Sequence, residues 1–337
     1  MTLKWGILST ANIALTQFIP AILRARNSEL VAIASRGPKV HAVAEQLGVV
    51  RAYETYEELL TDAEVDAVYI PLPNNLHAEW VVKAAQAGKH IICEKPIALT
   101  QEQFVQMQQA CEKHRVFLME AFMYQFHPQH QFVKQLISNG EIGEVKLYQS
   151  SHSFMLEDRK TNIRMDASKG GGAIWDVGCY SLHALQNLVG RQVETLYATS
   201  LFDENSGVDL TSSIIATLEN GVQAVIDCSF DMCDRNEVTI VGTKGSVKIE
   251  QAFRPDRAGH IGRIVITAGN EQRTVLLDGD IYRAEIEFFE QVIAGNESLQ
   301  QQHHLSFQNI ALINAAYASA NSKQVVSLKD LQAYGEG

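Results

Sequence analysis

Features that mark secreted, zinc-binding and membrane-spanning proteins are scarce in this sequence. Its 337 residues include only five cysteines, an odd number at irregular spacing with no C-x-x-C pair. This pattern indicates neither a disulfide framework nor a zinc site, and we expect small buried thiols in a reducing compartment. No apolar run approaches the roughly 20 residues that span a bilayer, and no signal peptide precedes the first expected strand. We therefore expect a cytoplasmic protein.

Positive charge is also in the minority. The 28 lysines and arginines face 39 aspartates and glutamates, which gives a formal net charge of -11 at pH 7. This balance argues against general binding to nucleic acid or to an anionic membrane. A local basic spot can still hold a phosphate.

The composition that is present fits an ordinary globular enzyme. Hydrophobic residues make up 46% of the chain and charged residues 20%. The length exceeds the usual size of one domain, so we expect two domains, 1–122 and 123–337. No internal repeat or low-complexity linker is visible, so we expect the two domains to pack together.

The first domain alternates short apolar strands with helical stretches. Such alternation is typical of a right-handed, doubly wound parallel sheet, the Rossmann architecture. Strands are expected at Lys4–Leu8, Leu30–Ala34, Ala67–Ile70, His90–Cys93 and Phe117–Glu120, and helices at Ala11–Arg26, Val40–Leu47, Thr55–Leu60, Leu76–Ala87 and Gln101–Lys113.

The second domain has longer, alternating strands joined by tight turns. The segments Glu219–Gly221 and Thr243–Gly245 have the composition of hairpin loops, which predicts a large, mostly antiparallel sheet in an α+β domain. Strands are expected at Lys146–Phe154, Glu194–Leu201, Ser212–Leu218, Val222–Phe230, Glu237–Val241, Ser246–Glu250 and Arg263–Thr267, and helices at Gln129–Ser138, Ile174–Leu188, Tyr282–Ile293 and Ser306–Ala318.

The first strand-to-helix turn has the composition of a dinucleotide-binding loop. In such a fold, small residues let backbone amides and a helix N-terminus approach a pyrophosphate. Ser9, Ala11 and Ala14 occupy the glycine positions of a degenerate G-x-G-x-x-[GA] motif. A tight structural turn needs the same small residues, but the position directly after the first strand favours the cofactor.

The end of the second expected strand indicates the type of ribose. NAD-dependent enzymes usually carry an acid there, about 20 residues after the motif, to accept the 2′-hydroxyl. This chain has Ser35 and Arg36, with Lys39 one turn later and no carboxylate. A hydroxyl and a guanidinium suit a 2′-phosphate, so we predict NADP, with NAD as a possible second cofactor. Alternatively, Arg36 is a solvated loop residue.

Four further motifs together carry a family resemblance. Three of them follow expected parallel strands, where ligands bind in such sheets: Tyr69–His77, Glu94-Lys95-Pro96 and Glu120–Tyr124. The fourth is the glycine-rich stretch Gly170–Tyr180. With these motifs, essentially the whole chain resembles the glucose–fructose oxidoreductase / inositol dehydrogenase / rhizopine catabolism (Gfo/Idh/MocA) family.

Within that family, the chain looks most like the branch of dimeric dihydrodiol dehydrogenases and NADP-dependent xylose dehydrogenases. The shared features are E-A-F-M-Y, N-I-R-M-D at Asn162–Asp166, and a tyrosine at position 180. Much of the wider family has histidine at that position, so Tyr180 argues against inositol activity. Bacterial relatives often carry arginine at the position of Gln125, and its absence argues against a phosphorylated or carboxylated substrate.

The resemblance implies a catalytic set drawn from both domains. It places Lys95 beside the substrate hydroxyl and the nicotinamide ribose, with Tyr180 of the second domain meeting it there. A phenol with a free pKa of about 10 needs a nearby ammonium to act as an acid or base near neutral pH, which Lys95 supplies. Asp176 lies one helical turn before Tyr180 and is expected to orient a substrate hydroxyl. Alternatively, it is a helix-start carboxylate near the positive end of the helix dipole. His183 follows on the same face, and we expect a packed structural histidine there.

The expected cofactor site combines the two nucleotide loops with the motifs that follow the third and fourth strands. His77 is expected to flank the nicotinamide pocket, and Pro96 suggests a turn with the cis bond known in the family. No metal-ligand cluster accompanies these residues. The cofactor residues are Ser9, Thr10, Ala11, Asn12, Ile13, Ser35, Arg36, Lys39, Pro71, Leu72, Asn74, His77, Glu94 and Lys95.

The resulting hypothesis is an NADP-dependent oxidoreductase that moves a hydride to or from a ring carbon of a sugar or cyclic polyol. Two alternatives stay open. One is a glycosidase-type enzyme of the same fold that retains its nicotinamide cofactor, and the other is a non-catalytic nucleotide-binding protein. The resemblance also implies a homodimer or homotetramer formed through the open face of the second sheet.

Overall fold

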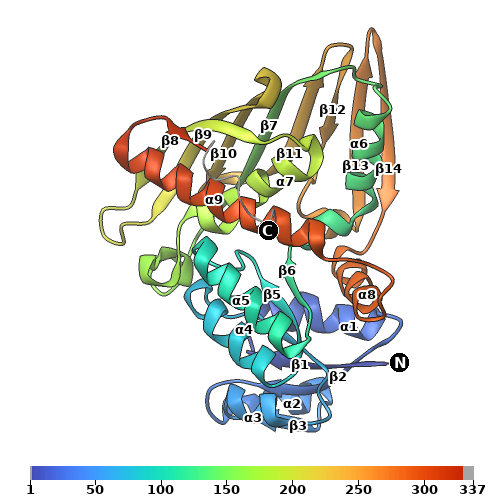
Figure 1. The fold of residues 1–337 in the computed structure, drawn as a ribbon, viewed down its shortest axis with the longest axis vertical. Helices are drawn as coiled ribbons and strands as arrows, with labels where there is room; N and C mark the ends of the chain where they lie inside the picture. The colour runs from blue at the N-terminus through green and yellow to red at the C-terminus, as the bar shows by residue number, and fades with distance from the viewer. Residues whose placement is uncertain (1, 329–337) are drawn as a thin grey trace. The chain divides into compact units, whose positions relative to one another are not determined.

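The computed structural model describes residues 2–328 of the chain (Figure 1). They form two compact units. The first contains the chain up to Met123 together with Tyr282–His303. The second contains Tyr124–Ile281 and the described chain from His304 onward.

The first unit is built on a six-stranded parallel sheet with strand order β3-β2-β1-β4-β5-β6. From β1 the sheet is extended on one side by β2 and β3 and on the other side by β4, β5 and β6, which confirms the predicted Rossmann architecture. The strands are β1 (Leu3–Leu8), β2 (Ser28–Ala34), β3 (Arg51–Tyr53), β4 (Ala67–Ile70), β5 (His90–Glu94) and β6 (Leu118–Ala121). The helices are α1 (Ile19–Arg24), α2 (Lys39–Leu47), α3 (Tyr56–Thr61), α4 (His77–Gln86), α5 (Gln101–His114) and α8 (Ile281–Ile293).

Neighbouring residues of β1 show how helices cover both faces of this sheet. The ring of Trp5 packs against Phe18, just before α1, and against Phe289 of α8, with ring centroids 5.4 and 5.9 Å apart. Gly6 points the opposite way, and a Cβ there would lie 2.7 Å from a methyl group of Leu59 on α3. Alternation along a strand therefore places α1 and α8 on one face and α3 on the other.

Helix α8 belongs to the first unit, although the expected boundary at 122/123 placed it in the second domain. Long-range contacts explain the difference. Phe289 packs on Trp5, and the carboxylate of Glu290 accepts hydrogen bonds from Ser28 Oγ at 2.6 Å and from the amide of Asn27. These partners are more than 260 positions apart in the sequence, so local patterning could not reveal them.

The second unit is built on a nine-stranded sheet with order β14-β13-β12-β11-β7-β10-β9-β8-β15. Its neighbouring strands pair antiparallel except β7 with β10, as expected for a mostly antiparallel sheet. The strands are β7 (Val145–Met155), β8 (Val193–Phe202), β9 (Asp209–Leu218), β10 (Gln223–Ser229), β11 (Asp231–Gly242), β12 (Gly245–Ile249), β13 (Ile261–Ala268), β14 (Glu271–Asp278) and β15 (Val326–Ser327).

Helices cover one face of the second sheet (Figure 1). They are α6 (Pro128–Ser138), α7 (Cys179–Val189) and α9 (Gln300–Ser322), of which all but the first residues of α9 belong to this unit. Tyr148 of β7 anchors α7 by donating its hydroxyl hydrogen to the carbonyl of Ser181 at 2.9 Å. Both expected hairpin loops occur, between β9 and β10 and between β11 and β12. Within residues 2–328, no helix is both long and apolar enough to span a bilayer.

Candidate functional site

The turn after β1 has the geometry of a nucleotide-binding loop. Ser9 adopts a φ of +153°, a value that glycine reaches more easily than other residues, and its hydroxyl accepts a hydrogen bond from the amide of Ala11 at 3.0 Å. Asn12 and Ile13 begin the following helix, whose next turn, Ala14–Phe18, is π-helical. Small side chains and a helix N-terminus at this turn fit a pyrophosphate.

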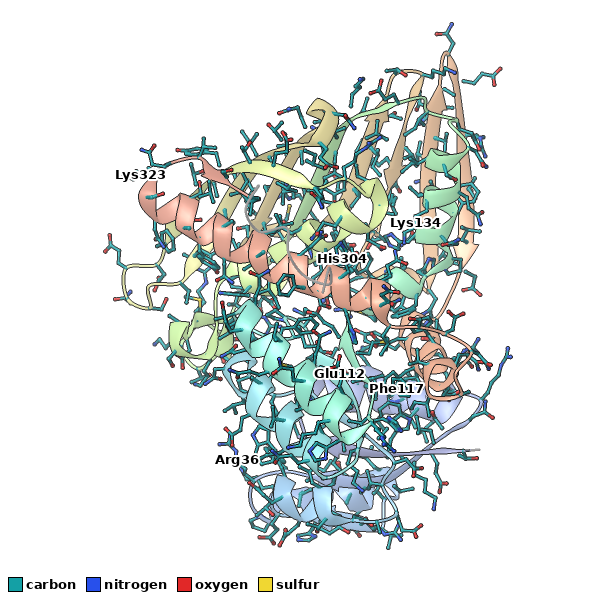
Figure 2. The ribbon with its side chains drawn as sticks, in the orientation of Figure 1. Arg36, Glu112, Phe117, Lys134, His304 and Lys323 are labelled. Atoms are coloured by element: carbon teal, nitrogen blue, oxygen red, sulfur yellow. The ribbon has the colours of Figure 1, made fainter. Side chains whose placement is uncertain are left out.

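The loop after β2 lies next to that turn. Thr10 Oγ and Ser35 Oγ are 3.3 Å apart, so the two loops predicted to hold the cofactor meet in the structure. The amide of Ser35 donates to the carbonyl of Tyr53 in β3. The side chains of Arg36, labelled in Figure 2, and Lys39 are exposed. Two cations in this loop suit a 2′-phosphate.

Lys95 lies in a turn that is held from three adjacent strands. The Lys95–Pro96 peptide bond is cis, as the family resemblance implied. The Lys95 amide donates to Glu94 Oε2 at 3.2 Å, and Tyr69 of β4 donates to Glu94 Oε1 at 2.5 Å. The amide of Ile97 donates to Glu120 Oε1 of β6 at 2.8 Å. These bonds use backbone groups and neighbouring acids, and they hold the turn that carries the half-buried Lys95 side chain.

His77 joins this turn to the loop that follows β4. Its buried ring lies between the carbonyl of Leu72, 2.8 Å from Nε2, and the carbonyl of Pro96, 2.9 Å from Nδ1. Burial, and to a smaller extent the charge of Lys95, lowers the pKa of His77, while the carbonyls of Pro96 and Leu72 act in the opposite direction. The ring therefore links the two loops through both of its nitrogens. Pro71 and Leu72 are buried, and Asn74 is half-buried at the start of the short 3-10 turn that follows.

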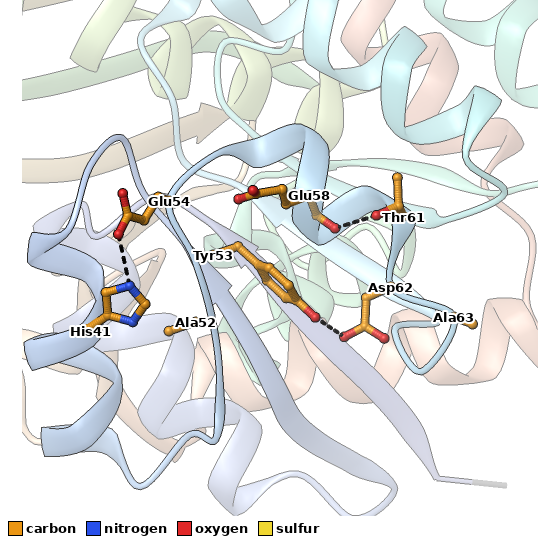
Figure 3. A pocket seen from close by; sticks show the side chains of 8 residues that line it. All are labelled: His41, Ala52, Tyr53, Glu54, Glu58, Thr61, Asp62 and Ala63. Atoms are coloured by element: carbon orange, nitrogen blue, oxygen red, sulfur yellow. Dashed lines mark hydrogen bonds and ion pairs between the residues drawn. The ribbon is translucent and has the colours of Figure 1, made fainter.

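The first unit also contains an open cavity of about 690 Å³ beside β3 (Figure 3). Tyr53 donates to Asp62 across it at 2.9 Å, and His41 lies 3.1 Å from Glu54. None of the predicted cofactor residues lines it, and its acidic side chains do not suit a phosphate. Its lining consists of His41, Ala52, Tyr53, Glu54, Glu58, Thr61, Asp62 and Ala63.

Asp176 and Tyr180 lie at the start of a long helix in the second unit. The helix opens with a π-helical segment, Ile174–Gly178, and continues as α7. π-Helical turns often occur at functional sites. Asp176 Oδ2 pairs with Arg164 Nε at 2.6 Å, so this carboxylate is oriented by a cation rather than only by the helix end. Arg164 belongs to the N-I-R-M-D motif that marked the family branch, but no role could be assigned to it from the motif alone.

Aromatic rings surround Tyr180. Its ring centroid lies 5.2 Å from that of His152, 5.5 Å from that of Phe253 and 6.0 Å from that of Tyr124. Tyr180 itself is only 6% exposed. His152 and Phe253 come from β7 and from the segment after β12, and the sequence offered no signal that would place them beside Tyr180.

His183 has the structural character that the sequence favoured. It is buried, and its Nδ1 lies 2.6 Å from the hydroxyl of Tyr124. Burial, with a contribution from the charge of Lys134, lowers the pKa of His183 to about 3. Lys134 of α6 donates to Asn187 Oδ1 on the same helix as His183, at 2.5 Å (Figure 2 labels Lys134). The His183 ring is therefore neutral near physiological pH.

The predicted residues thus fall into two sets. All of the cofactor residues and Lys95 belong to the first unit, whereas Asp176 and Tyr180 belong to the second. Across the described part of the chain, no group of three or more histidine, cysteine or acidic side chains is arranged to hold a metal ion. All five cysteines are free thiols, and only Cys233 is exposed.

Comparison with known proteins yields matches over most of the chain. The family model described as "Oxidoreductase family, NAD-binding Rossmann fold" matches residues 3–122, and the "GFO/IDH/MocA C-terminal domain" model matches residues 130–248. D-xylose 1-dehydrogenase (NADP(+)) 2 of Haloferax volcanii is 36% identical over 97% of this chain and 100% of its own. A trans-1,2-dihydrobenzene-1,2-diol dehydrogenase of Xenopus tropicalis is 34% identical over 74% of this chain and 76% of its own.

A solved structure with the same fold contains a bound dinucleotide. The 3-ketoreductase KijD10 from Actinomadura kijaniata, in complex with NADP and TDP-benzene, superposes with a TM-score of 0.89. It is 28% identical, and the match covers 95% of this chain and 98% of that one. These matches confirm the resemblance drawn from the four motifs, the fold class and the assignment as an oxidoreductase with a nicotinamide dinucleotide cofactor.

Proposed function

Since the chain belongs to the GFO/IDH/MocA family of oxidoreductases, we propose that it is an NADP-dependent enzyme acting on a ring carbon of a sugar or cyclic polyol. The observation that carries this proposal is the pair of adjoining loops after β1 and β2. They combine a turn whose φ at Ser9 is one that glycine favours, a helix N-terminus and two exposed cations. The position that carries an acid in NAD-dependent enzymes has no carboxylate here. Relatives whose names specify NADP and xylose, or NADP and a TDP-linked ligand, support the same reading.

The cofactor would be held by residues of the first unit. The turn Ser9–Ile13 would contact the pyrophosphate, and Arg36 and Lys39 the 2′-phosphate. The loop of Pro71, Leu72, Asn74 and His77 and the turn of Glu94 and Lys95 would border the nicotinamide. When bound, NADP supplies the nicotinamide carbon that accepts or returns a hydride.

The protein side chains would handle the proton and the orientation of the substrate. In the oxidative direction, the Tyr180 phenolate would take the proton of the substrate hydroxyl as that carbon becomes a carbonyl, and in reduction it would return it. The Lys95 ammonium would favour the phenolate and hold the reacting oxygen. Asp176, itself oriented by Arg164, would accept a hydrogen bond from a neighbouring hydroxyl of the substrate.

A substrate screen tests this proposal. The purified protein is incubated with aldopentoses, aldohexoses, inositols and dihydrodiols, with NADP and with NAD, and the absorbance of the reduced nicotinamide is followed. We expect net reduction of NADP with at least one sugar or cyclic diol. Cleavage of a glycoside without net change in absorbance would instead identify the cofactor-retaining glycosidase. Cofactor binding without any turnover would favour a nucleotide-binding protein.

Cofactor choice provides a separate prediction. We expect the wild type to bind NADP at least about tenfold more tightly than NAD, because one charge-assisted contact to a phosphate contributes roughly 1.5–3 kcal/mol and about 1.4 kcal/mol corresponds to tenfold. Arg36→Asp should reverse the preference, as measured by calorimetric titration with both dinucleotides. The control is Arg191→Asp, the same charge change at an exposed position in the second unit. Equal wild-type dissociation constants would contradict the assignment of Arg36.

We also propose that the enzyme works in the cytoplasm as a homodimer or homotetramer. Apolar side chains on the second sheet support this assembly, because Ile215 of β9 and Val225 of β10 pair with each other and are 52% and 42% exposed. Light scattering coupled to size-exclusion chromatography would give the mass directly. A monomer at micromolar concentration would contradict this assembly.

A further inference from the structure

A buried carboxylate and a phenol hold the glycine turn that precedes the catalytic helix. Gly172 has a φ of +124°, and a Cβ at this position would overlap both Asp209 Oδ1 and the hydroxyl of Tyr317. Only glycine leaves room for these two groups against the backbone. The family motif G-G-G-A therefore has a steric reason at its third glycine.

Asp209, the first residue of β9, accepts three hydrogen bonds inside the protein. Oδ2 accepts from the amide of Ile174 at 2.8 Å and from Ser212 Oγ at 2.9 Å, and Oδ1 accepts from the Tyr317 hydroxyl at 2.5 Å. Its side chain is fully buried, and burial raises its pKa while these bonds act in the opposite direction. A carboxylate bonded to the first amide of a helix is favoured by the helix dipole.

Tyr317 connects this carboxylate to a second element. It lies on α9, and its ring stacks on that of Trp175 with centroids 5.8 Å apart. Trp175 is the residue after Ile174 and the one before Asp176. Tyr317 is thus linked to the helix start in two ways. Its hydroxyl bonds to Asp209, which holds the Ile174 amide, and its ring packs on Trp175.

The backbone on the other side of the turn is also fixed. The amide of Gly172 donates to the carbonyl of Arg164, and the amide of Asp176 donates to the carbonyl of Gly172, both at 3.0 Å. The Arg164 side chain in turn pairs with Asp176. A shift of the glycine turn would therefore move Asp176 directly and rotate the start of the helix that carries Tyr180.

We propose that Asp209 and Tyr317 are positioning residues that hold this helix start in the orientation in which Asp176 and Tyr180 act. This inference rests on the proposed function and extends it to two residues that do not belong to the predicted catalytic or cofactor sets. Asp209 acts through the Ile174 amide, and Tyr317 acts through Asp209 and Trp175. The chemistry requires such precision because a small displacement of a catalytic group lowers the rate strongly.

The first test uses Tyr317→Phe, which removes one hydroxyl and keeps the ring stacked on Trp175. We expect kcat to fall about tenfold, with the dissociation constant for NADP unchanged. In a Tyr180→Phe background, the same substitution should lower kcat clearly less than tenfold, because one of the two groups that it positions is already gone and only Asp176 remains. Equal effects in both backgrounds, or a wild-type kcat in Tyr317→Phe, would overturn the proposal.

The control is Gly190→Ala at the other end of α7. Gly190 has a φ of +64° and open space around its Cβ position, so alanine introduces backbone strain without a collision. Gly190→Ala should lower the unfolding temperature while leaving kcat within twofold of wild type. If it lowers kcat as much as Tyr317→Phe does, general destabilisation explains both losses and the proposal fails.

Amide hydrogen exchange gives a readout that does not depend on turnover. In Tyr317→Phe, or in Asp209→Asn if the first variant does not fold, the amides of residues 174–178 should exchange at least tenfold faster than in wild type. Unchanged exchange there would overturn the proposed role of Asp209 and Tyr317 even in an active enzyme. Failure of the wild type to turn over any sugar, with faster exchange in the variant, would reject the proposed function while keeping the role of these two residues in holding the helix start.

Discussion

Lys95→Ala should reduce turnover by about a thousandfold or more while the protein stays folded and binds NADP. The ammonium is expected to favour the tyrosine phenolate and to stabilise charge on the reacting oxygen. Removing one such electrostatic group typically costs on the order of 10²–10³ in rate, and losing the proton-transfer partner adds to it. The measurement is kcat at saturating sugar and NADP, with cofactor affinity from fluorescence titration.

The fold should survive because several bonds that hold the turn involve groups other than the lysine side chain. The bonds from Tyr69 to Glu94 and from Ile97 to Glu120, and the ring of His77 against Pro96, all remain in the variant. Lys113→Ala, an exposed lysine on α5 of the same unit, controls for the loss of a charge. A near-normal kcat with an unchanged pH profile in Lys95→Ala would show that Lys95 has only a structural role.

The buried strands of the first unit were predictable because both of their faces are covered. Ala67–Ile70 has four consecutive buried residues, and its predicted bounds match β4. β3 was not predicted, because Arg51–Tyr53 is three residues long, half-buried and without an apolar run. Its importance comes from tertiary contacts, since its Tyr53 carbonyl receives the amide of Ser35 in the cofactor loop.

A strand at the edge of the second sheet could not be predicted from the sequence for a different reason. β14, Glu271–Asp278, was not predicted because its first four residues are exposed and polar, so it lacks the alternation of a half-buried strand. Among residues 2–328 it pairs only with β13 at the end of the sheet, and hydrogen bonds along that one side hold it in place. Such strands depend on their neighbour more than on their own sequence.

Some residues of the candidate site could be predicted from local motifs, whereas their contacts depend on residues far apart in the sequence. Short motifs singled out Ser9, Lys95 and Asp176 as candidates, the last two through the family resemblance. The pairing of Asp176 with Arg164 and the contact of Tyr124 with His183 join positions 12 and 59 residues apart. Those contacts depend on how the sheet and its helices pack, which no periodicity encodes.

Tyr180→Phe should slow the chemical step by about a hundredfold or more, the usual size of a general acid–base contribution. The substitution removes only the hydroxyl, so the ring keeps its packing against Tyr124, His152 and Phe253. NADP affinity should be unchanged, because the predicted cofactor residues belong to the first unit. Tyr197→Phe, at a half-buried tyrosine of β8, is the matched control and should keep kcat within twofold of wild type.

The rival proton carrier is His183, and the pH dependence of kcat distinguishes the two. Because burial lowers the pKa of His183 to about 3, this ring is neutral throughout the range from pH 5 to 8 and should produce no change of rate there. If Tyr180 is the base for oxidation, kcat should instead rise with pH toward a plateau, as the phenol loses its proton below its ordinary pKa of about 10. Tyr180→Phe should abolish that rise, and His183→Gln should retain it. Loss of activity in His183→Gln alone, with a normal rate and profile in Tyr180→Phe, would assign proton transfer to the histidine and leave the tyrosine as part of the pocket wall.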